Sequence, residues 1–114
     1  MRWSAASAVV VIALFTSGSS HAQEETGTIS GAGWVSCAEF AESYRASPKS
    51  TEDYFYAWAQ GYISGVNAAS LVRKNVRGWR LDQQKQHIRA YCAENPLANY
   101  VAAVQDLFGK LPNR

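Results

Sequence analysis

Nineteen consecutive residues without a charge, Tyr54 to Val72, set the strongest limit on how this chain folds. Asp53 precedes the run and Arg73 follows it. Within the run, apolar and aromatic residues recur at spacings of three and four, which is the period of an α-helix. The recurring positions are Tyr54, Phe55, Trp58, Tyr62, Val66 and Ala69. We therefore predict a central helix that is buried on most sides and is surrounded by the other helices.

Two glycines interrupt this predicted helix, Gly61 and Gly65. A glycine inside a helix costs about 1 kcal/mol relative to alanine, so two of them need a compensating role. Close approach of another backbone is the usual role of such glycines. We predict that Gly61 and Gly65 mark the place where another helix of the domain crosses the central helix.

A membrane span is the alternative interpretation of the uncharged run, because its length is sufficient to cross a bilayer. The glycine spacing also resembles the dimerisation motif of membrane helices. The run contains polar residues that would each need a hydrogen-bond partner in lipid, namely Gln60, Ser64, Asn67 and Ser70. We therefore expect a helix of a folded domain and no membrane span.

The first 22 residues have the pattern of a secretory signal peptide. Arg2 supplies the positive start, residues 8–15 are an apolar run, and Ser-His-Ala at 20–22 fits a cleavage site. We predict a mature chain that begins near Gln23 and is periplasmic or secreted. Without Arg2 the chain has ten Lys and Arg residues against nine Asp and Glu, and this near-neutral charge does not favour nucleic acid as a partner.

Cys37 and Cys92 are the only cysteines. In an exported protein they most simply form one disulfide, which for a loop of this length contributes roughly 4 kcal/mol. A redox or nucleophilic thiol is the alternative, although no CxxC motif is present. His87, the only histidine after the signal peptide, has no second metal-type ligand at helical spacing. We predict no catalytic site, no metal and no cofactor.

A capping-box pattern, Ser36 with Glu39, starts a helix over residues 37–46. The residues before it, 23–33, are rich in Gly, Ser and Thr and show no periodicity, so we predict a flexible N-terminal tail. Residues 34–114 then form one helical domain.

The remaining helix boundaries come from capping residues and proline. Ser50 or Thr51 can cap the central helix, and Asp82 can cap the next one. Asn95-Pro96 ends that helix and starts a last, strongly amphipathic one with the proline in its first turn. The predicted fold is all-α: a small four-helix domain around a central buried helix, with one disulfide, after a signal peptide.

The most basic segment is Arg73 to Arg80, with four basic residues in eight positions. Arg77, Trp79 and Arg80 are its candidates for binding a partner, because tryptophan and arginine are enriched among interface hot spots. The alternative is a solvated turn whose tryptophan folds back onto the core, since tryptophan is buried on average.

Three segments carry a resemblance to known families: Ser-Cys-Ala-Glu-Phe at 36–40, Trp-Ala-Gln-Gly-Tyr-Ile-Ser-Gly at 58–65 and Tyr-Cys-Ala-Glu-Asn-Pro-Leu at 91–97. Together they resemble the HdeA/HdeB-like proteins, which are small periplasmic helical domains held by one disulfide. The middle segment is also similar to the Tai-type immunity proteins of type VI secretion. The first resemblance implies an acid-stress chaperone that binds unfolded clients, and the second implies an inhibitor of a cognate secreted toxin.

Both families imply a non-enzymatic protein whose partner is another protein, and a homodimer is a further possibility. For the chaperone, low pH would loosen the fold by protonating carboxylates that cap helices or form ion pairs. The candidate carboxylates are Glu39, Glu42, Glu52, Asp53, Asp82, Glu94 and Asp106. An enzyme is the third hypothesis, and no nucleophile-base set or phosphate loop in the sequence supports it.

Overall fold

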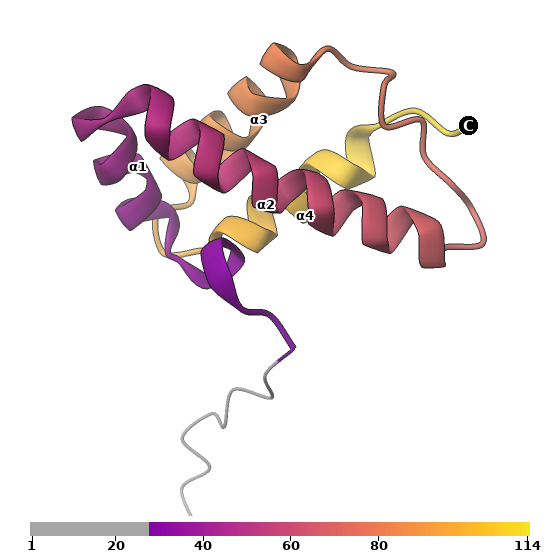
Figure 1. Ribbon diagram of the computed structural model, residues 1–114, viewed down its shortest axis with the longest axis horizontal. Coiled ribbons are helices and arrows are strands. Elements are labelled where there is room, and N and C mark those ends of the chain that lie inside the picture. Colours follow the sequence, from indigo (N-terminus) through magenta and orange to yellow (C-terminus); the bar gives the residue numbers. More distant parts are fainter. Residues whose placement is uncertain (1–27) are drawn as a thin grey trace, which may run out of the picture.

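The computed structural model describes residues 28–114, and Figure 1 shows the arrangement of its helices. The elements are a 3₁₀ turn, η1 (Gly31–Trp34), and four α-helices, α1 (Cys37–Ala46), α2 (Pro48–Ala69), α3 (Leu81–Glu94) and α4 (Tyr100–Lys110). The described part of the chain contains no β-strand. The all-α, four-helix prediction is confirmed. The predicted signal peptide, residues 1–22, and residues 23–27 of the predicted tail lie outside the described residues.

The predicted capping box starts α1. The Ser36 hydroxyl accepts a hydrogen bond from the Glu39 amide at 3.1 Å, and the Ser36 amide donates to the Glu39 carboxylate at 3.4 Å. The next amide, that of Cys37, donates to the carbonyl of Ala98 at 2.7 Å. The first turn of α1 is therefore held by its own cap and by the segment before α4, which satisfies amides that a helix start leaves without a partner.

The core forms where α1, α2, α3 and α4 meet. A disulfide joins Cys37 of α1 to Cys92 of α3, as predicted, and both residues are buried. Beside it, the rings of Phe40, Phe55 and Tyr100 lie with their centroids 4.9 to 5.0 Å apart. These rings come from α1, α2 and α4, so one aromatic cluster joins three helices. Burial is the main cause that raises the pKa of the Tyr100 phenol far above its usual value.

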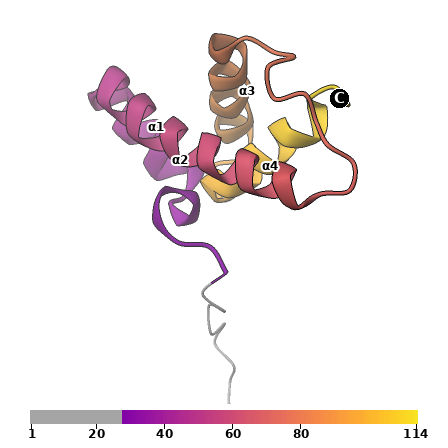
Figure 2. The same ribbon diagram turned by 45° about the vertical axis from the view of Figure 1, so that its right-hand side comes forward.

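α2 crosses the front of the molecule in Figure 1, and α3 and α4 lie behind it. The turned view in Figure 2 also shows α3 and α4 behind α2. The buried residues of α2 form one stripe: Thr51, Phe55, Tyr56, Ala59 and Ile63. Trp58, Tyr62 and Val66 are only half-buried. The prediction that this helix is buried on most sides was therefore wrong, because its other face is exposed.

Gly61 and Gly65 lie on that exposed face. A methyl group added at either position would have no neighbour within 4 Å. The reason is helical geometry: Gly61 is two residues from both Ala59 and Ile63, which places it on roughly the opposite side of the helix. The predicted helix crossing at the two glycines is therefore wrong within this chain.

The close approach of a glycine occurs instead at η1. A Cβ atom on Gly33 would lie 2.1 Å from the ring of Trp58, and Gly31 has a φ of 71°, which favours glycine. The Trp58 indole N–H donates to the carbonyl of Ser30 at 3.0 Å. Residues 31–33 are thus folded against α2, and the prediction of a flexible tail up to residue 33 was wrong for them.

α2 starts earlier than its predicted caps allow. Pro48 is its first residue and Ser47 occupies the N-cap position. Ser50 and Thr51 lie inside the helix, so the prediction that one of them caps it was wrong. The Thr51 hydroxyl donates instead to the carbonyl of Ser43 in α1 at 2.9 Å.

The starts of α3 and α4 also differ from the prediction. Arg80 occupies the N-cap position of α3, and Asp82 lies in the first turn, where its charge still suits the positive end of the helix. α4 begins at Tyr100, four residues after Pro96. The carbonyl of Pro96 accepts a hydrogen bond from the first turn of α1, so this segment braces α1 instead of forming a helical turn of α4.

Candidate partner-binding surface

The exposed side of α2 is a helix surface without a charged residue from Tyr54 onwards. Its residues follow one another at spacings of three and four: Tyr54, Ala57, Gly61, Ser64 and Ala68, with Gly65 beside them. We call these six residues the α2 outer face. Each is exposed, and Tyr54 has 62% of its residue surface in solvent. No helix of this chain packs against Gly61 and Gly65, and their lack of side chains leaves room for another protein to approach this backbone closely.

A fixed aromatic pair borders the α2 outer face. The rings of Trp58 and Tyr62 stack with their centroids 5.3 Å apart and their planes at 15°. The Tyr62 hydroxyl accepts a hydrogen bond from the side-chain amide of Gln105 in α4 at 2.9 Å. The bond from Trp58 to Ser30 ties the other ring to η1. The edge of the surface is therefore rigid, which lowers the entropy lost when a partner binds.

The α2–α3 connection begins with a pair of exposed aliphatic residues. Leu71 and Val72 are 104% and 67% exposed. Immediately afterwards the chain is anchored again: the side chain of Asn67 exchanges two hydrogen bonds with the backbone of Lys74, at 2.7 and 3.0 Å. The amide of Asn75 donates to the carbonyl of Pro112 at 2.7 Å. Leu71 and Val72 were not among the predicted binding residues, although their position before a basic segment was a usable signal.

Gln84 holds the later part of the same connection. Its side-chain N–H groups donate to the carbonyls of Val76 and Trp79, both at 2.9 Å, and its oxygen accepts from the Tyr56 hydroxyl at 2.7 Å. The side chain is buried, and both its oxygen and its nitrogen have partners in the protein. Burial also raises the pKa of the Tyr56 phenol. Gln84 therefore joins α2, α3 and the α2–α3 connection. This role was not predicted from the sequence.

The three predicted partner-binding residues do not form one exposed patch. Trp79 is half-buried against the core, and its ring meets the His87 ring edge-on with centroids 5.6 Å apart. Arg80 is exposed and pairs with Asp82 at 3.2 Å. Arg77 is exposed beside a hollow of about 410 Å³. The tryptophan thus folds back onto the core, as the alternative interpretation stated, and the two arginines remain outside.

Two charge contacts tie neighbouring helices together. Glu52 of α2 pairs with Arg89 of α3, and the Arg89 guanidinium lies 5.1 Å from the centroid of the Tyr44 ring in α1. His87 of α3 lies 2.7 Å from the carboxylate of Asp106 in α4. Both contacts therefore hold neighbouring helices together.

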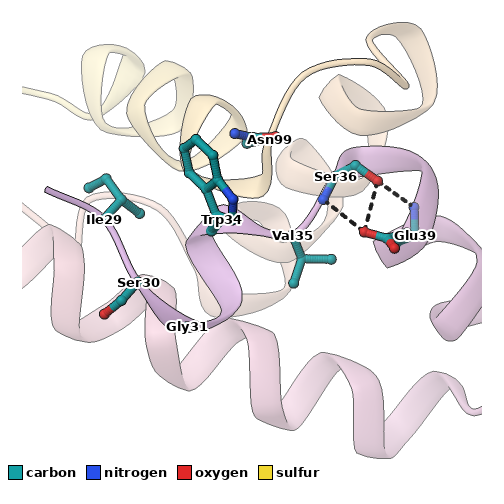
Figure 3. Close-up of a pocket in the computed structure, with 8 residues that line it drawn as sticks. All are labelled: Ile29, Ser30, Gly31, Trp34, Val35, Ser36, Glu39 and Asn99. Carbon is teal, nitrogen blue, oxygen red and sulfur yellow. Dashed lines mark hydrogen bonds between the residues drawn. The ribbon is translucent and has the colours of Figure 1, made fainter. Parts of the chain in front are cut away.

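A hollow of about 520 Å³ lies between η1 and the start of α4 (Figure 3). Its lining residues are Ile29, Ser30, Gly31, Trp34, Val35, Ser36, Glu39 and Asn99. The only carboxylate in this lining belongs to Glu39, which is engaged in the capping box with Ser36. The hollow therefore offers a half-exposed tryptophan and no free charged group. In residues 28–114 no group of three or more His, Cys, Asp and Glu residues could hold a metal ion.

The fold and these surfaces define a small, disulfide-linked four-helix domain with an uncharged, exposed helix face. Comparisons with protein-family models, with curated proteins and with solved structures found no match to this chain. None of the described helices combines the length and the apolar character needed to cross a membrane.

Proposed function

We propose that this chain is a non-enzymatic, exported protein-binding factor whose role resembles that of HdeA-type acid-stress chaperones. The observation that carries the proposal is the α2 outer face. It presents exposed positions over most of a 22-residue helix without one charge between Tyr54 and Val72. Exposed uncharged surface of this extent is typical of a site that another protein covers. A client would bind along the helix through its apolar segments.

The acid response in this proposal comes from carboxylates at the joints of the fold. Glu39 closes the cap of α1, Glu52 pairs with Arg89 across α2 and α3, and Asp106 pairs with His87 across α3 and α4. In this proposal acid weakens one helix cap, one cross-helix ion pair and one cross-helix contact between a histidine and a carboxylate. The disulfide keeps α1 and α3 connected while the other contacts loosen.

The sign of one further acid effect follows from a shifted pKa. The hydrogen bond from Lys49 lowers the pKa of the Asp53 carboxyl below its usual value. A lowered pKa in the folded state means that this pair stabilises the fold above the unfolded pKa and that the contribution disappears as pH falls through the folded pKa. The contribution of Asp53 to stability is therefore lost in acid, and it is small because both side chains of the pair are exposed.

The test is light scattering of an acid-denatured client at about pH 2–3, where carboxylates are protonated. The chain from Gln23 onwards should suppress aggregation of the client. Ala57→Arg places a charge on the α2 outer face at every pH used and should abolish suppression. Ala93→Arg is the matched control, because Ala93 is also an exposed helical alanine but lies on α3. Client aggregation that is unchanged by the unmodified chain contradicts the proposal.

Inhibition of a cognate secreted toxin is the alternative role. It needs a rigid patch that contains Arg77, Trp79 and Arg80 together, and Trp79 is turned toward His87 instead. The geometry supports this role less well than client binding. Capture of a secreted toxin that is lost in the Arg77→Ala, Arg80→Ala variant, with no effect on client aggregation, would favour the alternative.

A further inference from the structure

We propose that one end of the molecule docks on an anionic phospholipid surface. This end, which we call the basic tip, consists of residues 70–77 and residues 109–114. Leu71 and Val72 would enter the lipid at the headgroup boundary, while a cluster of cations beside them would hold a lipid phosphate. The inference does not depend on the client-binding role, because it uses other residues.

The apolar part of the basic tip projects from the fold. The connection that leaves the C-terminal end of α2 forms one extremity of the helical body in Figure 1. The chain is fixed on both sides of Leu71 and Val72. Before them, the Ser70 hydroxyl donates to the carbonyl of Val66 at 2.7 Å, and after them Lys74 is bonded to Asn67. Between these anchors, Leu71 is as exposed as in an extended peptide.

The cations of the basic tip gather around one hollow. Lys74, Arg77 and Arg114 line a space of about 410 Å³ together with Asn67, Asn75 and Val76. The amide of Arg114 donates to the carbonyl of Arg73 at 2.9 Å, which brings the C-terminal cation next to the loop. Within the described residues, none of the three lining cations forms an ion pair with a carboxylate. Three unpaired cations around a hollow are suited to a phosphate group.

The excess of positive charge lies at the tip. No acidic side chain occurs between Asp53 and Asp82, and Asp106, the carboxylate near the tip, is already paired with His87 and Lys110. At the opposite end, around α1, the carboxylates of Glu39, Glu42, Glu52, Asp53 and Glu94 are nearly balanced by the cations of Arg45, Lys49, Lys85 and Arg89. The excess of positive charge therefore lies at the tip, and an anionic surface would attract this end of the molecule first.

The exposed aliphatic pair favours lipid over an acidic protein as the occupant. A protein partner would need a pocket that is complementary in shape to the projecting Leu71 side chain. A bilayer accepts an apolar side chain without shape complementarity. Stable membrane attachment without a spanning helix needs two signals, an apolar group and a basic patch. The basic tip has both, and its two aliphatic residues predict binding that is reversible, sensitive to salt and dependent on anionic lipid.

Vesicle flotation of the chain from Gln23 onwards tests the proposal, with phosphatidylcholine vesicles that contain or lack phosphatidylglycerol. We expect binding only with phosphatidylglycerol, and release at high salt. Lys74→Gln with Arg77→Gln should weaken binding roughly thirtyfold at low salt, because each basic residue near an anionic surface contributes about fivefold. Leu71→Ser with Val72→Ser should weaken it about tenfold or more.

Matched control variants distinguish docking at the basic tip from nonspecific binding to vesicles. Leu97→Ser removes an equally exposed leucine, 96% in solvent, from the segment before α4. Arg45→Gln with Lys49→Gln removes two cations from the opposite end. Both controls should bind vesicles as the unmodified chain does, and circular dichroism should show that every variant is folded.

Three results would overturn the proposal. The first is equal binding to vesicles without phosphatidylglycerol, and the second is an equal loss in the Leu97→Ser control. The third is binding of inorganic phosphate or of polyglutamate without any binding to vesicles, which would assign the cations to a free anion or to an acidic protein.

Discussion

The two ends of this molecule use the same kinds of residue in opposite ways. At the disulfide end, aromatic residues of α1, α2 and α4 are buried against one another, with Phe40 in contact with both Phe55 and Tyr100. At the tip end, Leu71 and Val72 are exposed, and the chain is held mainly by polar bonds from Asn67 and Gln84. The first end stabilises the fold, and the second exposes surface that the fold does not need.

This difference shows how a small helical domain can expose apolar surface without losing its structure. The disulfide and the aromatic cluster join three helices at one end, so the C-terminal half of α2 need bury only Ile63 and the half-buried residues near it. Its other side is then available to partners. Four changes test this division, and they are given in order of decreasing effect on the free energy of unfolding.

Loss of the disulfide should have the largest effect. Replacing Cys37 and Cys92 by alanine opens a loop with a sequence separation of 55 residues, and we expect the free energy of unfolding to fall by roughly 4 kcal/mol. Urea denaturation followed by circular dichroism measures this change. Reductant should reproduce it in the unmodified chain and have no further effect on the double variant. An unchanged midpoint would show that the aromatic cluster alone holds this end.

Gln84→Ala should have the next largest effect, and it acts on the tip end. The substitution leaves the carbonyls of Val76 and Trp79 without their partner, so we expect a loss of about 2 kcal/mol. Hydrogen exchange should also become faster in the α2–α3 connection than in α1. Gln86→Ala, at an exposed position of the same helix, is the control and should change stability by less than about 0.5 kcal/mol.

The sequence predicted the disulfide end better than the tip end, and the reason is physical. The capping box of Ser36 and Glu39 is a local motif of four residues. Cys37 and Cys92 are the only two cysteines, so only one disulfide is possible. Both features can therefore be identified from the sequence alone. The face of α2 that is buried depends on where the other helices lie. Aromatic residues occur on both sides of that helix, and the pattern therefore did not distinguish the stripe of Phe55 and Ile63 from that of Tyr54 and Trp58.

The binding surface was harder to predict for a related reason. Gly61 and Gly65 have the spacing of a helix crossing, but spacing does not state whether the crossing helix belongs to the same chain. Gln84 is one of four consecutive polar residues, 83–86, and only the path of the α2–α3 connection brings two carbonyls to it. Long-range placement, which short sequence patterns do not encode, decided each of these cases.

Alanine at Gly61 or Gly65 should change stability less, and in the opposite direction. Because the added methyl group meets nothing within 4 Å, each substitution should raise the free energy of unfolding by about 1 kcal/mol. Gly33→Ala is the contrasting variant and should destabilise, since its methyl group would collide with the Trp58 ring. If Gly61→Ala destabilises the isolated chain, the outer side of α2 is packed against something in solution, and a second copy is then the first occupant to test.

Leu71→Ala should have the smallest effect on folding. Its side chain is in water in the folded chain as well as in the unfolded one, so little apolar surface is transferred on unfolding and the free energy should change by less than about 0.5 kcal/mol. The same substitution at Leu107, which is fully buried in α4, should cost about 2 to 5 kcal/mol. The comparison matters because a leucine that does not stabilise the fold can still bind a lipid surface. If Leu71→Ala lowers stability as much as a core substitution does, Leu71 is packed in solution, and the separation between a stabilising end and a docking end fails.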